Sequence, residues 1–193
     1  MAECSPSVLI LGHSFVRRMY EDLRNRFHPR ANWNFDLSDA TVSFHGVGGR
    51  TVKKLKKYDL EAVRRLNPDI IILEIGTNDL SLPHSDPSRI GSAIHDFVNL
   101  LLESFSVKIV GVCHVIPRCS YASHPQFWEK ALLLQQYLSV VLDSPNVFCW
   151  KHSSFSNSSK PFYLPDGVHL NPVGQYLLYR SYRGAILKAL RML

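Results

Sequence analysis

Short apolar runs alternate with amphipathic stretches along the chain. Residues 8–11 are four apolar residues that end at Gly12, a pattern typical of a buried strand in a parallel sheet. From Phe15 to Phe27 apolar residues recur four positions apart among arginines, which predicts a helix with one buried face. Residues 41–45 alternate as a second strand does, and residues 69–75 are nearly all apolar and predict a central parallel strand.

The same alternation continues to the C-terminus. Further helices are predicted over 52–66, from 87 after an Asp86 cap, over 125–142, and from 172 after an Asn171 cap, and further strands over 107–115 and 146–150. Strand and helix alternate about five times, and right-handed crossovers of this kind predict an α/β fold, a three-layer α/β/α sandwich with a five-stranded parallel sheet. Because no linker or internal repeat divides the sequence, we expect residues 1–193 to form one domain.

Residues able to carry chemistry follow the predicted strands. Ser14 follows the first strand, a glycine pair ending at Gly49 the second, and Asn78 the third, while Asp166 and His169 follow the fifth. Each has an ordinary structural explanation on its own, such as a helix cap at Ser14. Because ligands bind beyond the carboxyl ends of parallel strands, the set together predicts one acyl-transfer site.

The residue types suit nucleophilic catalysis. A Ser14 hydroxyl needs a neutral imidazole, here His169, to take its proton, and the Asp166 carboxylate would fix the tautomer of that imidazole. The backbone N–H groups of Ser14 and Gly49 and the side-chain amide of Asn78 would stabilise the oxyanion. Such a reaction needs no metal or cofactor, and the four cysteines lack the spacing of a structural zinc site.

Four blocks, at residues 12–14, 48–49, 76–79 and 166–171, resemble the sequence blocks of the SGNH (GDSL-like) hydrolase superfamily. The resemblance spans nearly the whole chain. It implies a flavodoxin-like sandwich and a serine esterase in which the serine, aspartate and histidine above form the triad. It also implies that a glycine and the asparagine complete the oxyanion hole. We assign the glycine role to Gly49 rather than Gly48 because the second glycine lies next to the helix start.

One position departs from the family pattern. The family usually has Asp before the serine, and this chain has His13, which would either brace the turn or add an ionisable group near Ser14. The stretch 12–18 resembles the esterase domain of first-frame proteins of non-LTR (LINE-type) retrotransposons. The chain is similar, more distantly, to the catalytic subunits of platelet-activating-factor acetylhydrolase. The retrotransposon resemblance implies RNA and membranes as partners.

Charge and composition leave a second class of function open. The 193 residues carry a formal net charge of +6, with basic clusters on the predicted helices. Such clusters bind RNA or an anionic membrane surface, or simply form solvated helix faces. The alternative to an esterase of short acyl (acetyl) esters, lipids among them, is therefore a weak or inactive module that binds RNA or membranes. The two functions can also coexist, and Phe155, Phe162 and Tyr163 would then enter the membrane; otherwise they would pack over the triad loop.

The length and position of the apolar runs predict the localisation of the protein. None of them approaches the ~20 residues of a membrane span, and the N-terminal pattern differs from a signal peptide. We therefore expect a cytoplasmic protein, or a domain of a longer one. The sequence leaves the oligomeric state open.

Overall fold

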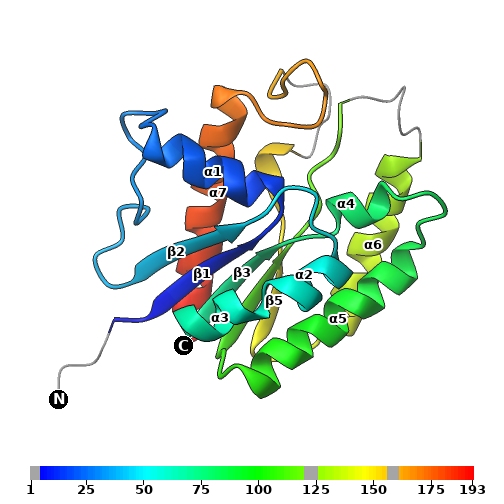
Figure 1. Cartoon of the computed structure of the whole chain (residues 1–193), viewed down its shortest axis with the longest axis horizontal. Coiled ribbons are helices and arrows are strands. Elements are labelled where there is room, and N and C mark those ends of the chain that lie inside the picture. Colours follow the sequence, from blue (N-terminus) through cyan, green and yellow to red (C-terminus); the bar gives the residue numbers. More distant parts are fainter. Residues whose placement is uncertain (1–4, 120–125, 156–160) are drawn as a thin grey trace.

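A computed structural model describes residues 5–119, 126–155 and 161–193 (Figure 1). Five parallel strands form one sheet in the order β2-β1-β3-β4-β5, which is the flavodoxin-like order. The strands are β1 Ser7–Gly12, β2 Thr41–Gly46, β3 Ile70–Glu74, β4 Ile109–Cys113 and β5 Val147–Trp150. The sheet confirms the predicted fold class.

Helices cover both faces of this sheet (Figure 1). One layer holds α1 and α7, and the other holds α2, α3, α5 and α6. The helices are α1 Ser14–Arg24, α2 Val52–Tyr58, α3 Leu60–Leu66, α4 Thr77–Leu80, α5 Pro87–Ser104, α6 Phe127–Val141 and α7 Pro172–Leu190, with a 3₁₀ turn, η1, at Ser153–Phe155.

Alternation along the strands divides the core between the two layers. In β1, Val8 and Ile10 pack with α1 and α7, whereas Leu9 and Leu11 pack with the opposite layer. This is the period of two expected for a strand buried on both faces, and it explains the unbroken apolar run that marked this segment in the sequence.

The starts of α5 and α7, which were predicted from N-cap residues, agree with the structure. The Asp86 side chain accepts from the N–H of Ser88 at 2.9 Å, and Asn171 accepts from Gly174 at 3.0 Å. The predicted start at residue 125 lies outside the described residues.

Two helix predictions were wrong. The single helix expected over 52–66 is two helices that meet at Asp59, because this buried side chain turns inward to hydrogen-bond His45 and Arg50. Helix α1 ends at Arg24 rather than Phe27, where Arg26 takes a positive φ of 51°. Short helix α4 was not predicted, since four residues are too few for a periodic pattern.

Candidate active site

Ser14 is the first residue of α1 and follows β1 directly. The turn is tight: the N–H of His13 donates to the carbonyl of Glu74 at 3.3 Å, and a Cβ at Gly12 would lie 2.1 Å from that same oxygen. Only glycine therefore fits at position 12. The Ser14 side chain is half-buried, and its N–H belongs to the first helical turn, where backbone donors lack helical partners.

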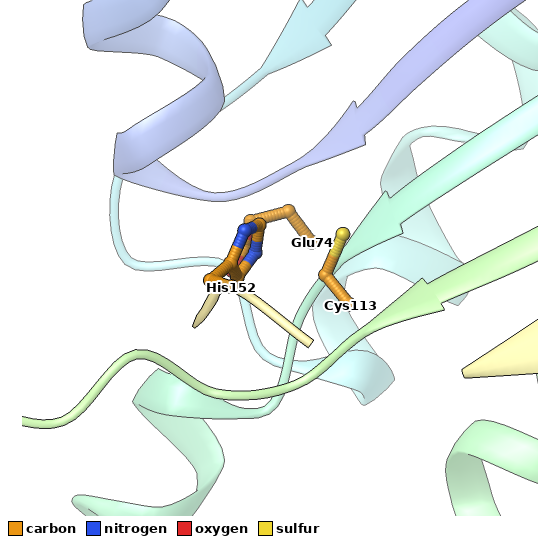
Figure 2. Close-up of side chains that lie close together, drawn as sticks. All are labelled: Glu74, Cys113 and His152. Carbon is orange, nitrogen blue, oxygen red and sulfur yellow. The ribbon is translucent and has the colours of Figure 1, made fainter. Parts of the chain in front are cut away.

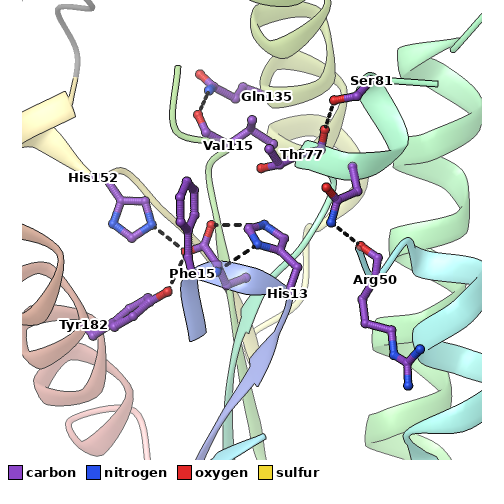
Figure 3. Close-up of polar contacts among 11 residues, drawn as sticks. His13, Phe15, Arg50, Thr77, Ser81, Val115, Gln135, His152 and Tyr182 are labelled. Carbon is purple, nitrogen blue, oxygen red and sulfur yellow. Dashed lines mark hydrogen bonds and ion pairs between the residues drawn. The ribbon is translucent and has the colours of Figure 1, made fainter. Parts of the chain in front are cut away.

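The loop between β2 and α2 presents Gly49 in the open. Gly49 has a φ of +71°, and a Cβ built there would meet nothing within 4 Å. Two contacts hold this loop beside the serine turn. The N–H of Val47 donates to the carbonyl of Gly12 at 3.1 Å, and the Asn78 side-chain amide donates to the carbonyl of Arg50 at 2.8 Å (Figure 3).

Strand order brings the three predicted oxyanion donors together. Because β1 lies between β2 and β3, the turn of Ser14 is flanked by the Gly49 loop on one side and by Asn78, in α4, on the other. Asn78 uses an amide N–H to hold Arg50, and an amide nitrogen carries a second N–H. The arrangement can offer N–H donors from three segments to one oxygen atom.

Asp166 and His169 form a pair within one turn before α7. Oδ2 of Asp166 lies 2.7 Å from Nδ1 of His169, and Oδ1 accepts from the backbone N–H groups of Val168 and His169 at 2.9 and 2.8 Å. Partial burial acts to raise the pKa of Asp166, but these hydrogen bonds outweigh it and lower the pKa to about 2. The carboxylate is therefore ionised throughout the physiological pH range. It hydrogen-bonds the imidazole of His169 at Nδ1, which leaves Nε2 free of this contact.

The His169 ring lies beside the serine turn. It stands edge-on to the ring of Phe15, with centroids 6.4 Å apart, and Phe15 is the residue after Ser14. Among the described residues, the Ser14 hydroxyl forms no hydrogen bond with His169 in this conformation. In unliganded enzymes catalytic hydrogen bonds are commonly long and tighten only when substrate binds.

His13 braces the serine turn as a neutral residue. Its side chain is 1% exposed, and Nδ1 accepts from the N–H of Phe15 at 3.4 Å as the N-cap of α1. Burial lowers the pKa of His13 to about 4; the Glu74 charge opposes this shift, and Arg118 and His169 add to it. At neutral pH the imidazole is therefore uncharged, which favours the first of the two roles predicted for it.

A group of buried polar residues that the sequence did not predict lies beneath the site. The carboxylate of Glu74, in β3, accepts from His152 at 2.9 Å and from the hydroxyl of Tyr182 at 3.1 Å (Figure 3). Arg118 lies close enough to Asp166 for their charges to interact. A lone carboxylate within an apolar strand was the one indication of this cluster in the sequence.

The three loop aromatics pack inward. Phe155 is 1% exposed, and Phe162 stands edge-on to it with centroids 6.0 Å apart. The Tyr163 hydroxyl donates to the carbonyl of Pro117. Tyr163 forms a bridge with Leu170, and the N–H of Asn171 donates to the carbonyl of Phe162, so these aromatics pack against the loop that carries Asp166 and His169. Within the described part of the chain, no helix has the length and apolar character to cross a bilayer.

Comparison with known proteins identifies the family of this chain. The model of the GDSL-like lipase/acylhydrolase family matches residues 10–177, from β1 into α7. The chain belongs to the GDSL-like lipase/acylhydrolase family. Its match includes every residue that we assigned to the site. No curated protein matched the chain in sequence.

Solved structures share the fold of this GDSL-like chain. A GDSL-like lipase from Bacteroides thetaiotaomicron superposes with a TM-score of 0.72 at 16% identity, covering 98% of this chain and 93% of its own. An esterase from Pseudoalteromonas sp. gives 0.71 at 15% identity, with 96% and 99% covered. A catalytic mutant of an acetylxylan esterase from Geobacillus stearothermophilus gives 0.68 at 16%, with 94% of both chains covered. Identities this low show the shared fold alone.

Proposed function

We propose that this GDSL-like chain is a serine esterase that hydrolyses esters of short acyl groups, acetyl esters in particular. The observation that carries the proposal is the edge of the sheet where Ser14, Gly49 and Asn78 follow adjacent strands and the Asp166–His169 pair lies beside the Ser14 turn. In this mechanism His169 removes the proton of Ser14, whose oxygen attacks the ester carbonyl. The alcohol leaves with a proton from His169, and water activated by His169 then releases the acid.

Cavity size supports a short acyl group. A cavity of about 140 Å³ lies at the carboxyl end of β4 and is lined by Val115, Ile116, Pro117, Trp128, Leu132 and Phe155, among others. A cavity of about 150 Å³ holds a molecule the size of benzene. A cavity of this size fits an acyl chain of a few carbons. We propose it as the acyl pocket.

The deciding experiment uses Ser14→Ala with a series of p-nitrophenyl esters of increasing acyl length. We expect the variant to lose hydrolysis of the acetyl ester while its circular dichroism spectrum and melting temperature stay close to wild type. We also expect an alkyl fluorophosphonate to label the wild type once and the variant not at all. Undiminished turnover in Ser14→Ala would refute the proposal.

A second function is compatible with the first. Tyr20, in the arginine-rich α1, and Trp33 are each 42% exposed, and their rings stand edge-on with centroids 5.0 Å apart. Exposed aromatic rings among cations suit stacking on bases or insertion at a membrane interface. This is the observation that favours the RNA or membrane partner implied by the retrotransposon resemblance. Salt-sensitive binding to single-stranded RNA or anionic vesicles, unaffected by the fluorophosphonate and lost in Trp33→Ser, would support it.

A further inference from the structure

Glu74 is a buried carboxylate directly beneath the serine turn. It ends β3, pairs in register with Gly12 of β1, and its side chain is completely buried. Its carbonyl already accepts from the N–H of His13. Both the backbone and the side chain of Glu74 therefore face the segment that carries Ser14.

Oε2 of Glu74 is fixed by two hydrogen bonds from residues other than His13. The oxygen accepts from Nε2 of His152 and from the hydroxyl of Tyr182. Ser181, in α7, lies 2.8 Å from Nδ1 of His152 and also accepts from Trp150 at 3.0 Å. Removing a charge from water is costly unless such partners satisfy it, so this network fixes where the carboxylate lies.

Oε1 of Glu74 faces His13. Oε1 lies 3.9 Å from Nε2 of His13, and both atoms are buried without a hydrogen-bond partner among the described residues. Nδ1 of His13 can accept from Phe15 only when the ring proton sits on Nε2. A carboxylate oxygen opposite Nε2 favours that tautomer, because it attracts the N–H and repels a lone pair.

We propose that Glu74 is a positioning residue that holds His13 in the Nε2–H tautomer, so that Nδ1 caps α1 and fixes the start of the helix where Ser14 lies. This rests on the proposed esterase function. It also accounts for the departure at position 13. An aspartate there would place a second negative charge beside a buried carboxylate, whereas a neutral imidazole caps the helix and donates toward Glu74.

A metal ion is the competing explanation for the same cluster. Ligand atoms of Glu74, Cys113 and His152 lie within 4.8 Å of one another, all three residues are buried, and these are ligand types that zinc accepts (Figure 2). However, Nε2 of His152 and Oε2 of Glu74 already bond to each other, and Tyr182 shares that oxygen. A metal would have to replace these bonds, so we favour the hydrogen-bonded network.

The test is a double-mutant cycle of wild type, Glu74→Gln, His13→Asn and the double variant, read as the rate of fluorophosphonate labelling. A glutamine at 74 leaves its carbonyl to His152 and Tyr182 and turns its N–H₂ toward His13. The imidazole then moves its proton to Nδ1 and loses the cap. We expect labelling to slow by about 100-fold, as a small displacement of a nucleophile does.

Asparagine at position 13 separates positioning from general stability. An asparagine caps through its amide oxygen whatever faces it, so in the His13→Asn background the change at 74 should alter labelling by no more than about twofold. Asp69→Asn is the matched control: it makes the same chemical change at the opposite end of the strand, where Asp69 pairs with Lys108, and should leave labelling unchanged. Equal slowing by Glu74→Gln in both backgrounds would overturn the proposal.

Two further measurements distinguish failure of this proposal from failure of the esterase function. The ¹⁵N spectrum of the wild type should show His13 protonated on Nε2, and Glu74→Gln should show it on Nδ1; Nδ1 protonation in the wild type would overturn the proposal even if no variant folds. A wild type that is never labelled would refute the esterase function and leave this tautomer test standing. Stoichiometric zinc in the purified wild type, lost in Glu74→Gln, would also overturn the proposal.

Discussion

Oδ1 of Asp166 holds two backbone N–H groups while Oδ2 holds Nδ1 of His169, so the carboxylate is fixed in one orientation. In Asp166→Asn the amide oxygen would keep the two backbone donors and the N–H₂ would face Nδ1. The imidazole proton would then sit on Nε2, where it blocks base catalysis. We expect kcat to fall on the order of 10³- to 10⁴-fold with little change in melting temperature. A loss below about tenfold would contradict the triad assignment.

Asn78 should matter for the rate more than for binding. Its amide lies beside the serine turn, and removing one oxyanion donor costs on the order of 100-fold in kcat. We expect Asn78→Ala to lower kcat by that factor with KM nearly unchanged. Ser81→Ala, which removes the hydroxyl that donates to the carbonyl of Thr77 at the end of the same short helix, is the control. A raised KM at constant kcat would remove Asn78 from the oxyanion hole.

Alanine substitution should have different effects on activity and stability at the adjacent glycines Gly48 and Gly49. Gly49 has a positive φ, where an L side chain costs about 1–2 kcal/mol. We expect Gly49→Ala to lower both kcat and the melting temperature, the latter by about 2–8 °C, measured by calorimetry. At Gly48 the nearest atoms to an added Cβ belong to Arg17, at 3.8 Å, and φ is not positive, so Gly48→Ala should be tolerated. The reverse result would assign the oxyanion role to Gly48.

Acyl selectivity should respond to one leucine of α6 and not to its neighbour. Leu132 lines the cavity, whereas Leu133 is 54% exposed and lies outside its lining. Leu132→Ala enlarges the cavity, so the longest acyl chain hydrolysed at half the maximal rate should increase relative to wild type. Leu133→Ala makes the same truncation and should leave the chain-length profile unchanged. Identical profiles in all three proteins would place the acyl pocket elsewhere.

The contribution of Asp79 to the free energy of unfolding should decline as the pH rises from about 4 to about 6. Asp79 is 8% exposed, and burial raises its pKa to about 6 although the N–H of Val52 donates to it. The folded protein then binds this proton more tightly than the unfolded chain. The contribution to stability is full below pH 3.8 and is lost as the pH passes about 6, a change of about 3 kcal/mol. The lowered pKa of His13 acts in the opposite direction over the same range in both proteins, so the test compares them. Urea unfolding should show the free energy of unfolding of wild type falling relative to that of Asp79→Asn as the pH rises; parallel curves would contradict the prediction.

Local sequence patterns determined the strands, two helix starts and one side-chain pair of this protein. Each of the five strands was predicted to within two residues at either end. An apolar run marked the buried strands β1, β3 and β4, because strands buried on both faces carry a nearly unbroken apolar sequence, whereas alternation marked β2. The caps at Asp86 and Asn171 located two helix starts, because a capping side chain acts on the backbone two or three residues away. The pair at Asp166 and His169 was predictable for the same reason, since both lie in one turn.

Contacts between distant segments required the tertiary structure. The break at Asp59 depends on Arg50 and His45, and the neutral state of His13 depends on its burial beneath the sheet edge, which outweighs the opposing charge of Glu74. Sequence alone placed Glu74 in a strand but gave it no partner, because His152 and Tyr182 lie 78 and 108 residues away. Periodicity reports which face of an element is buried. Only the packed fold decides which charges share that interior.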